Sequence, residues 1–135
     1  MESQAHIDLV NRVLEYSKLI IPQDNYNLIQ VDSDGANSNF RTNNNFVPDV
    51  FYKFDDLLVI GEAKTYDDFE RKHSKEQYDD YIDECRYYSG TAKLVIGVPW
   101  QLVMTAKNYF KRIKKRENLD FEIIIVNEIG KDFKV

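Results

Sequence analysis

Apolar residues recur along the chain with two periods, one typical of helices and the other of strands. The helical period places five apolar residues on one side of a helix over residues 3–20, namely Ile7, Val10, Val13, Leu14 and Ile20. Pro22 ends this helix, because proline lacks the amide hydrogen that a continuing helix needs. Residues 27–32 then predict a short strand, and residues 33–45 a polar loop long enough to bind a ligand.

Two apolar runs, residues 47–54 and 57–64, predict a β-hairpin whose second strand is covered on both faces. The rest of the chain alternates between helix and strand. The expected elements are a helix over residues 67–89, a strand over 93–98, a helix over 100–117 and a strand over 121–126. The order αβββαβαβ predicts an α/β protein, whose second half favours parallel strand pairing with right-handed crossovers. No linker or repeat divides residues 1–135, so we expect a single domain.

The predicted hairpin brings two acidic residues face to face. Asp55-Asp56 is a plausible two-residue turn, which pairs Phe54 with Leu57 and, five steps further out, Asp49 with Glu62. Lys64 lies on the same face as Glu62, because side chains alternate along a strand. Opposed side chains have Cβ atoms roughly 4.5–5.5 Å apart, and like charges at that distance are destabilising. The pair therefore predicts a cation between the two carboxylates, with a lysine beside it.

Composition narrows the class of protein. The chain is 43% hydrophobic and 30% charged, which is ordinary for a globular domain. No run approaches the ~20 apolar residues of a membrane span, and the N-terminus lacks the basic and apolar regions of a signal peptide. The single cysteine, Cys85, excludes a disulfide framework and a cysteine-based zinc site, and we expect it to be buried. We therefore expect a cytoplasmic protein without membrane contact.

Charge is distributed unevenly along the chain. The net charge of −5 does not favour binding to phosphates, but residues 103–116 hold only basic charges. On a helix, four of these lie opposite the apolar face: Lys107, Lys111, Lys114 and Lys115. A solvated helix face explains this pattern, and contact with nucleic-acid phosphates is the alternative.

The hairpin residues and the order of elements resemble a known nuclease superfamily. Pro48-Asp49 opens one strand and Glu62-Ala63-Lys64 closes the next, which is similar to the motif of the PD-(D/E)xK, or restriction-endonuclease-like, nucleases. Gln77 on the following helix resembles the arrangement in Holliday-junction-resolvase-like and VRR-NUC-type nucleases. The resemblance covers roughly residues 3–98. It implies a restriction-endonuclease-like αβββαβ core, with a mixed central sheet flanked by helices and an additional C-terminal helix and strand.

The resemblance also implies a role for each residue of the motif. Asp49 and Glu62 would bind one or two Mg²⁺ ions, for which Mn²⁺ would substitute, with the backbone carbonyl of Ala63 as a further ligand. Lys64 would orient or help to deprotonate the attacking water. Gln77 would face the metal site and position water or phosphate.

Four further residues have alternative assignments relative to this site. Resolvase-like members often carry a metal-binding glutamate on the first helix, but Glu15 lies opposite the apolar stripe and we expect it to face solvent. His6 lies within the stripe and is the alternative for that position. Asp32, at the end of the first strand, is either a further acid of the site or a strand-end residue. His73 shares a helix stripe with Gln77 and is either a site residue or a half-buried helix residue.

The function implied is metal-dependent hydrolysis of phosphodiester bonds in DNA, in recombination, repair or defence. A domain of this size leaves little room for base-specific loops, so recognition of DNA structure or ends is favoured over sequence readout. The alternatives are an inactive nuclease-like module that only binds nucleic acid, and a subunit whose specificity comes from a partner protein. Small nuclease cores often work as homodimers, so a second copy of the chain is another expected partner.

Overall fold

The computed structural model describes residues 3–32 and 39–135. Its helices are α1 (Gln4–Ile20), α2 (Lys72–Arg86) and α3 (Val103–Arg116), with short 3-10 helices η1 (Gln23–Leu28) and η2 (Trp100–Leu102). Its strands are β1 (Gln30–Val31), β2 (Val50–Phe54), β3 (Leu57–Ala63), β4 (Thr91–Gly97), β5 (Glu122–Val126) and β6 (Asp132–Lys134). None of these helices is long and apolar enough to cross a membrane. Part of the expected loop over residues 33–45, namely 33–38, lies outside the described residues.

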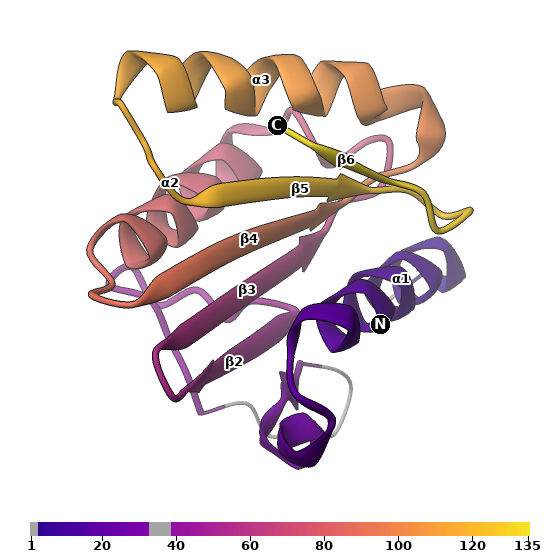
Figure 1. Ribbon diagram of the computed structural model, residues 1–135. Coiled ribbons are helices and arrows are strands. Elements are labelled where there is room, and N and C mark those ends of the chain that lie inside the picture. The colour runs from indigo at the N-terminus through magenta and orange to yellow at the C-terminus, as the bar shows by residue number, and fades with distance from the viewer. Residues whose placement is uncertain (1–2, 33–38) are drawn as a thin grey trace.

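The strands form one mixed sheet in the order β1-β2-β3-β4-β5-β6 (Figure 1). β3, β4 and β5 are parallel, and the remaining neighbours are antiparallel. The expected α/β class, mixed sheet and hairpin are therefore confirmed.

Asp55 and Asp56 both have positive φ, 52° and 65°, as a two-residue type I′ turn requires. Phe54 pairs with Leu57 and Val50 with Gly61, so the hairpin has the register that the sequence predicts.

Helices cover both faces of the sheet. α1 packs on one face, where buried residues alternate along the strands, as in Val50, Val59, Val95 and Ile124. α2 and α3 pack on the other face, over Ile60, Leu94, Ile96 and Ile123. The strands β3, β4 and β5 are buried on both faces, which explains why their sequences are almost continuously apolar.

α1 approaches the sheet closely because two glycines lie beneath it. A Cβ atom at Gly61 would lie 2.4 Å from Val13 Cγ1, and one at Gly97 would lie 2.6 Å from Val13 Cγ2. Val13 is fully buried between them.

The buried stripe of α1 consists of Leu9, Val10, Val13 and Ser17. Ile7 is 37% exposed, so the expectation that Ile7 faces the core was wrong.

The second helix is shorter than the sequence predicts. We expected a helix over residues 67–89, but residues 65–71 form hydrogen-bonded turns and α2 begins at Lys72. These turns bury Phe69, whose carbonyl accepts a hydrogen bond of 2.8 Å from the Tyr78 hydroxyl. Burial of one aromatic ring thus prevails over the helix-favouring acidic residues before it.

Two strands also differ from expectation. Residues 27–32 were expected to be a strand, but a 3-10 turn extends to Leu28 and leaves only Gln30–Val31 as β1. The side chains of this turn bind its neighbours, since Asn25 donates to the Tyr52 hydroxyl and Tyr26 to the Lys18 carbonyl. β6 was not predicted, because three residues with one apolar side chain give no recognisable period. It forms where Asn127 closes a turn after β5.

The close contact between α1 and the sheet predicts a specific loss of stability. Gly97→Ala should lower the free energy of unfolding by about 1–3 kcal/mol, because its methyl group overpacks against Val13. Urea denaturation of the single and double variants measures this. In Gly97→Ala with Val13→Ala the loss should be smaller than the sum of the two single losses, since the truncated valine leaves room. Strict additivity would contradict the proposed contact.

Candidate active site

The predicted acidic pair lies at the carboxyl end of β3, next to the start of β2. The hairpin register, continued by one residue pair beyond Val50 and Gly61, places Asp49 opposite Glu62. Both residues are buried, with 7% and 4% of their surfaces exposed. Two carboxylates therefore lie together inside the protein, where the cost of charge is greatest.

Each acidic residue of the pair is held by the backbone of the opposite strand. The Asp49 amide donates to Glu62 Oε1 over 3.1 Å, and the Ala63 amide donates to Asp49 Oδ2 over 2.8 Å. The N–H and C=O of one strand residue project to the same side, so the Ala63 carbonyl also faces the Asp49 side. The side of β3 that faces Asp49 thus offers two carboxylates and a backbone carbonyl to a cation.

Lys64 joins this pair to α2. Its Nζ atom lies 3.2 Å from Glu62 Oε2 and donates a hydrogen bond to Gln77 Oε1. The lysine side chain is only 11% exposed. The structure thus brings together Asp49, Glu62, Lys64 and Gln77, the four residues expected to form the site.

The surroundings of Glu62 disfavour its charged form. Burial, followed by the nearby charge of Asp49, raises its pKa to about 8, although Lys64 acts in the opposite direction. The Tyr81 hydroxyl donates to Glu62 Oε1 over 3.2 Å. Tyr81 is a residue of the site that the sequence analysis does not include. Its spacing of four residues from Gln77 is the sequence signal that both side chains face the same group.

The four residues with alternative assignments lie in different places. His6 Nε2 lies 3.4 Å from Asp49 Oδ2, so α1 approaches the site through His6. Glu15 is 64% exposed and pairs with Arg12, which confirms that it faces solvent. The Asp32 amide donates to the Asp49 carbonyl, and burial together with the charge of Asp49 raises the Asp32 pKa. His73 is exposed and packs edge-on against the aromatic ring of Phe46, away from the position that was considered for it in the site.

A second buried acid, absent from the sequence-based site, positions the segment before β2. Asp80 on α2 accepts hydrogen bonds from the Thr42 hydroxyl and from the backbone and side-chain amides of Asn44. Asp80 is 7% exposed. α2 therefore holds the segment that leads into Asp49 as well as contacting Lys64 and Glu62. No sequence pattern distinguished Asp80 from the other acids of this helix.

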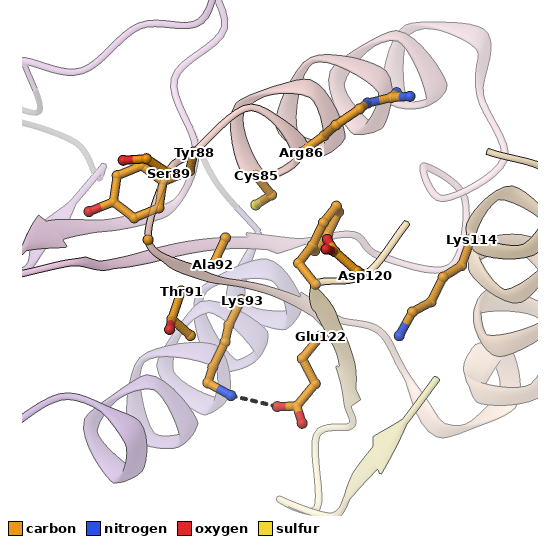
Figure 2. A pocket seen from close by; sticks show the side chains of 12 residues that line it. Cys85, Arg86, Tyr88, Ser89, Thr91, Ala92, Lys93, Lys114, Asp120 and Glu122 are labelled. Carbon is orange, nitrogen blue, oxygen red and sulfur yellow. Dashed lines mark hydrogen bonds and ion pairs between the residues drawn. The ribbon is translucent and has the colours of Figure 1, made fainter. Parts of the chain in front are cut away.

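The basic side chains of α3 lie apart from the carboxylates. α3 starts beyond the carboxyl end of β4 and runs back along the sheet, so its last turns lie at the opposite end (Figure 1). Lys114 lines a cavity of about 620 Å³ at the amino ends of β4 and β5, together with the ion pair Lys93–Glu122 (Figure 2). Lys107 lies over the Phe133 ring, whereas Lys111 and Lys115 are exposed. The structure therefore does not join the second half of α3 to the acidic pair.

The oxygen donors of the site suit a small divalent cation. Within residues 3–32 and 39–135, no three His, Cys, Asp or Glu side chains are grouped so that they could hold a metal. Mg²⁺, however, is commonly bound by one or two carboxylates, with waters and substrate phosphates completing its shell. Asp49, Glu62 and the Ala63 carbonyl match that requirement, and a cation would relieve the repulsion that raises the Glu62 pKa.

Comparison of the chain with protein-family models, curated proteins and solved structures finds no match.

The raised pKa of Glu62 predicts how stability depends on pH. Between its ordinary value of 4.5 and about 8, the unfolded chain loses the Glu62 proton while the folded chain keeps it. Stability must therefore fall as pH rises through this window, by roughly 1.4 kcal/mol per pH unit at most. Glu62→Gln lacks this titration, so its stability relative to wild type should rise from pH 5 to pH 8. Urea denaturation in EDTA measures the difference, and parallel pH profiles would contradict it.

Proposed function

We propose that this protein is a metal-dependent nuclease of the PD-(D/E)xK type, which hydrolyses phosphodiester bonds in DNA. One observation carries the proposal: Asp49 and Glu62 are buried side by side at the end of the central hairpin, and the half-buried Lys64 lies 3.2 Å from Glu62. An arrangement of this kind is costly for stability, because two carboxylates repel each other in a poorly solvated place. Groups held at such a cost are candidates for a functional site.

Asp49, Glu62 and the Ala63 carbonyl would hold the metal ion. When bound, a divalent ion lowers the pKa of a coordinated water and stabilises negative charge on the scissile phosphate. Glu62 and Gln77 orient Lys64, whose ammonium group has three hydrogen-bond donors. Two of these are used by Glu62 and Gln77, so the third is available to a water or a phosphate oxygen. Lys64 would thereby position the nucleophile beside the phosphate.

The charge and size of the protein indicate which feature of DNA it would recognise. A net charge of −5 gives little general attraction for a phosphate backbone. The basic half of α3 runs away from the carboxylates, so it does not extend their site into one basic groove. We therefore favour recognition of DNA ends or irregular structures over reading of a duplex sequence. The second candidate, a subunit that receives its specificity from a partner protein, is favoured by the same shortage of basic surface near the site.

Metal binding tests the site without any assumption about substrate. Calorimetric titration with Mn²⁺ should show binding to the wild type and loss of that binding in Asp49→Asn and Glu62→Gln, which keep the shape of each side chain. Glu15→Gln removes an exposed carboxylate of α1 and serves as the matched control. Equal Mn²⁺ binding by all four proteins would remove the basis for the proposed site.

Cleavage tests the reaction itself. Lys64→Ala should reduce the cleavage rate by roughly 10²–10⁴-fold, the usual range for loss of a positioned proton-transfer group. Linear, nicked, branched and single-stranded DNA in Mg²⁺ or Mn²⁺ are the substrates, and product is measured on denaturing gels. Lys93→Ala breaks a lysine–glutamate ion pair at the other end of β4 and should leave the rate unchanged.

The same assay separates the nuclease from its alternatives. If wild type and Lys64→Ala are equally inactive on every substrate but still bind DNA, the protein is a binding module and not a nuclease. Cleavage that appears only after a partner protein is added, and that still requires Lys64, identifies a catalytic subunit.

A further inference from the structure

Two exposed aromatic side chains lie in the segments that follow β3 and β4. Tyr66 is 62% exposed and Trp100 is 60% exposed. Among the described residues, the Tyr66 hydroxyl and the Trp100 indole nitrogen have no hydrogen-bond partner, and neither ring packs against another ring or a cation. Other large aromatic rings of the chain, such as Phe69, Tyr78 and Phe110, pack together in the core. Within the described part of the chain, the two exposed rings therefore take part in no hydrogen bond, ring contact or cation contact through their side chains.

The sheet places both aromatic residues at the same edge. β3 and β4 are parallel neighbours whose last residues, Ala63 and Gly97, are paired. Tyr66 follows Ala63 by three residues, and Trp100 follows Gly97 by three residues. Lys64 lies between Ala63 and Tyr66, and its amide donates to the Gly97 carbonyl over 2.8 Å. A phosphate held at Lys64 would thus be close to the segments that carry both rings.

These segments border a cleft with acidic walls. The cleft has a volume of about 810 Å³ and is lined by Tyr66 and by Pro99 and Gln101, the residues on either side of Trp100. Its charged lining comprises Asp8, Asp67, Asp68 and Glu128, with Arg71 as the single basic residue. A phosphate backbone lying in this cleft would be repelled. Uncharged, flat groups that hydrogen-bond to carboxylates would be accepted, and exposed nucleobases have both properties.

We propose that Tyr66 and Trp100 form a stacking platform for unpaired bases, so that the substrate is single-stranded DNA or a splayed DNA end. This inference rests on the proposed nuclease function, because it assigns the strand held by the platform to the cleavage site at Lys64. In a paired duplex the bases are stacked on one another and cannot reach the rings. Stacking on aromatic side chains tolerates any base sequence, which agrees with a domain that has little room for base-specific loops.

Fluorescence tests the platform directly, because Trp100 is the only tryptophan of the chain. The test uses a 12-nucleotide oligothymidine and the Lys64→Ala protein in Mg²⁺, in which turnover should be slowed by roughly 10²–10⁴-fold. Binding should quench Trp100 emission, and an abasic oligonucleotide of the same length should bind about tenfold more weakly and cause no quenching. Failure of oligothymidine to bind overturns the inference. So does binding, seen by anisotropy of a labelled oligonucleotide, that leaves Trp100 emission unchanged.

A second test of the platform measures cleavage by the protein with Lys64 intact. Tyr66→Ala and Trp100→Ala should each lower the ratio of single-stranded to fully paired cleavage rates by about tenfold, whereas Trp100→Phe should retain most of it. Tyr87→Ala is the matched control, because Tyr87 is 78% exposed and lies after the last residue of α2. Unchanged ratios in Tyr66→Ala and Trp100→Ala overturn the inference. The two exposed rings would then be assigned to contact with a protein partner.

The two proposals can fail separately. If no DNA is cut in any metal while oligothymidine still quenches Trp100, the platform stands and the nuclease proposal fails. If cleavage requires Lys64 but is indifferent to Trp100→Ala on every substrate, the nuclease stands and the platform fails.

Discussion

The burial of two carboxylates side by side is the constraint on which the candidate site depends. Asp49 and Glu62 are held by reciprocal hydrogen bonds to each other's strand, and the hydroxyl of Tyr81 and the ammonium of Lys64 complete the surroundings of Glu62. This arrangement requires β2 and β3 to keep one register, since a slip of one residue would send Glu62 to the other face. The two-residue turn at Asp55-Asp56 and the buried alternation of both strands maintain that register.

Helices on opposite faces of the sheet reach the same end of it. α2 contributes Gln77, Tyr81 and the buried Asp80, which ties down the segment before Asp49. α1 lies on the other face, and its first turn carries His6 to within 3.4 Å of Asp49. That approach is possible because Gly61 and Gly97 leave space for Val13. The glycines of the sheet therefore determine how near the first helix comes to the acids.

The two ends of the parallel strands carry different groups of residues. The carboxyl ends of β3 and β4 carry the acidic pair, the lysine and the exposed rings of Tyr66 and Trp100. The amino ends of β4 and β5 carry the cavity with Lys93, Lys114 and Glu122. Segments after parallel strands gather at one edge, and this edge is where open α/β sheets commonly bind ligands. The candidate site lies at the edge that this rule favours, although α3 extends towards the other edge.

Much of the site was accessible from the sequence because it depends on local geometry. A short turn and a period of two residues are enough to place Asp49 opposite Glu62 and Lys64 on the same face, and helical spacing turns Gln77 and Tyr81 the same way. Contacts between distant segments were not accessible. His6 beside Asp49, Asp80 beneath the segment of Thr42 and Asn44, and the late start of α2 all arise from packing between elements.

The sequence by itself determined the alternation of elements, the hairpin register and the three charged groups of the motif, because these follow from periodicity within a few residues. Only the tertiary structure decided which helix face meets the acids, where the basic residues of α3 lie, and that Tyr66 and Trp100 share one edge. These depend on the order of strands in the sheet and on how closely helices pack against it. Such long-range relations leave no period in the chain.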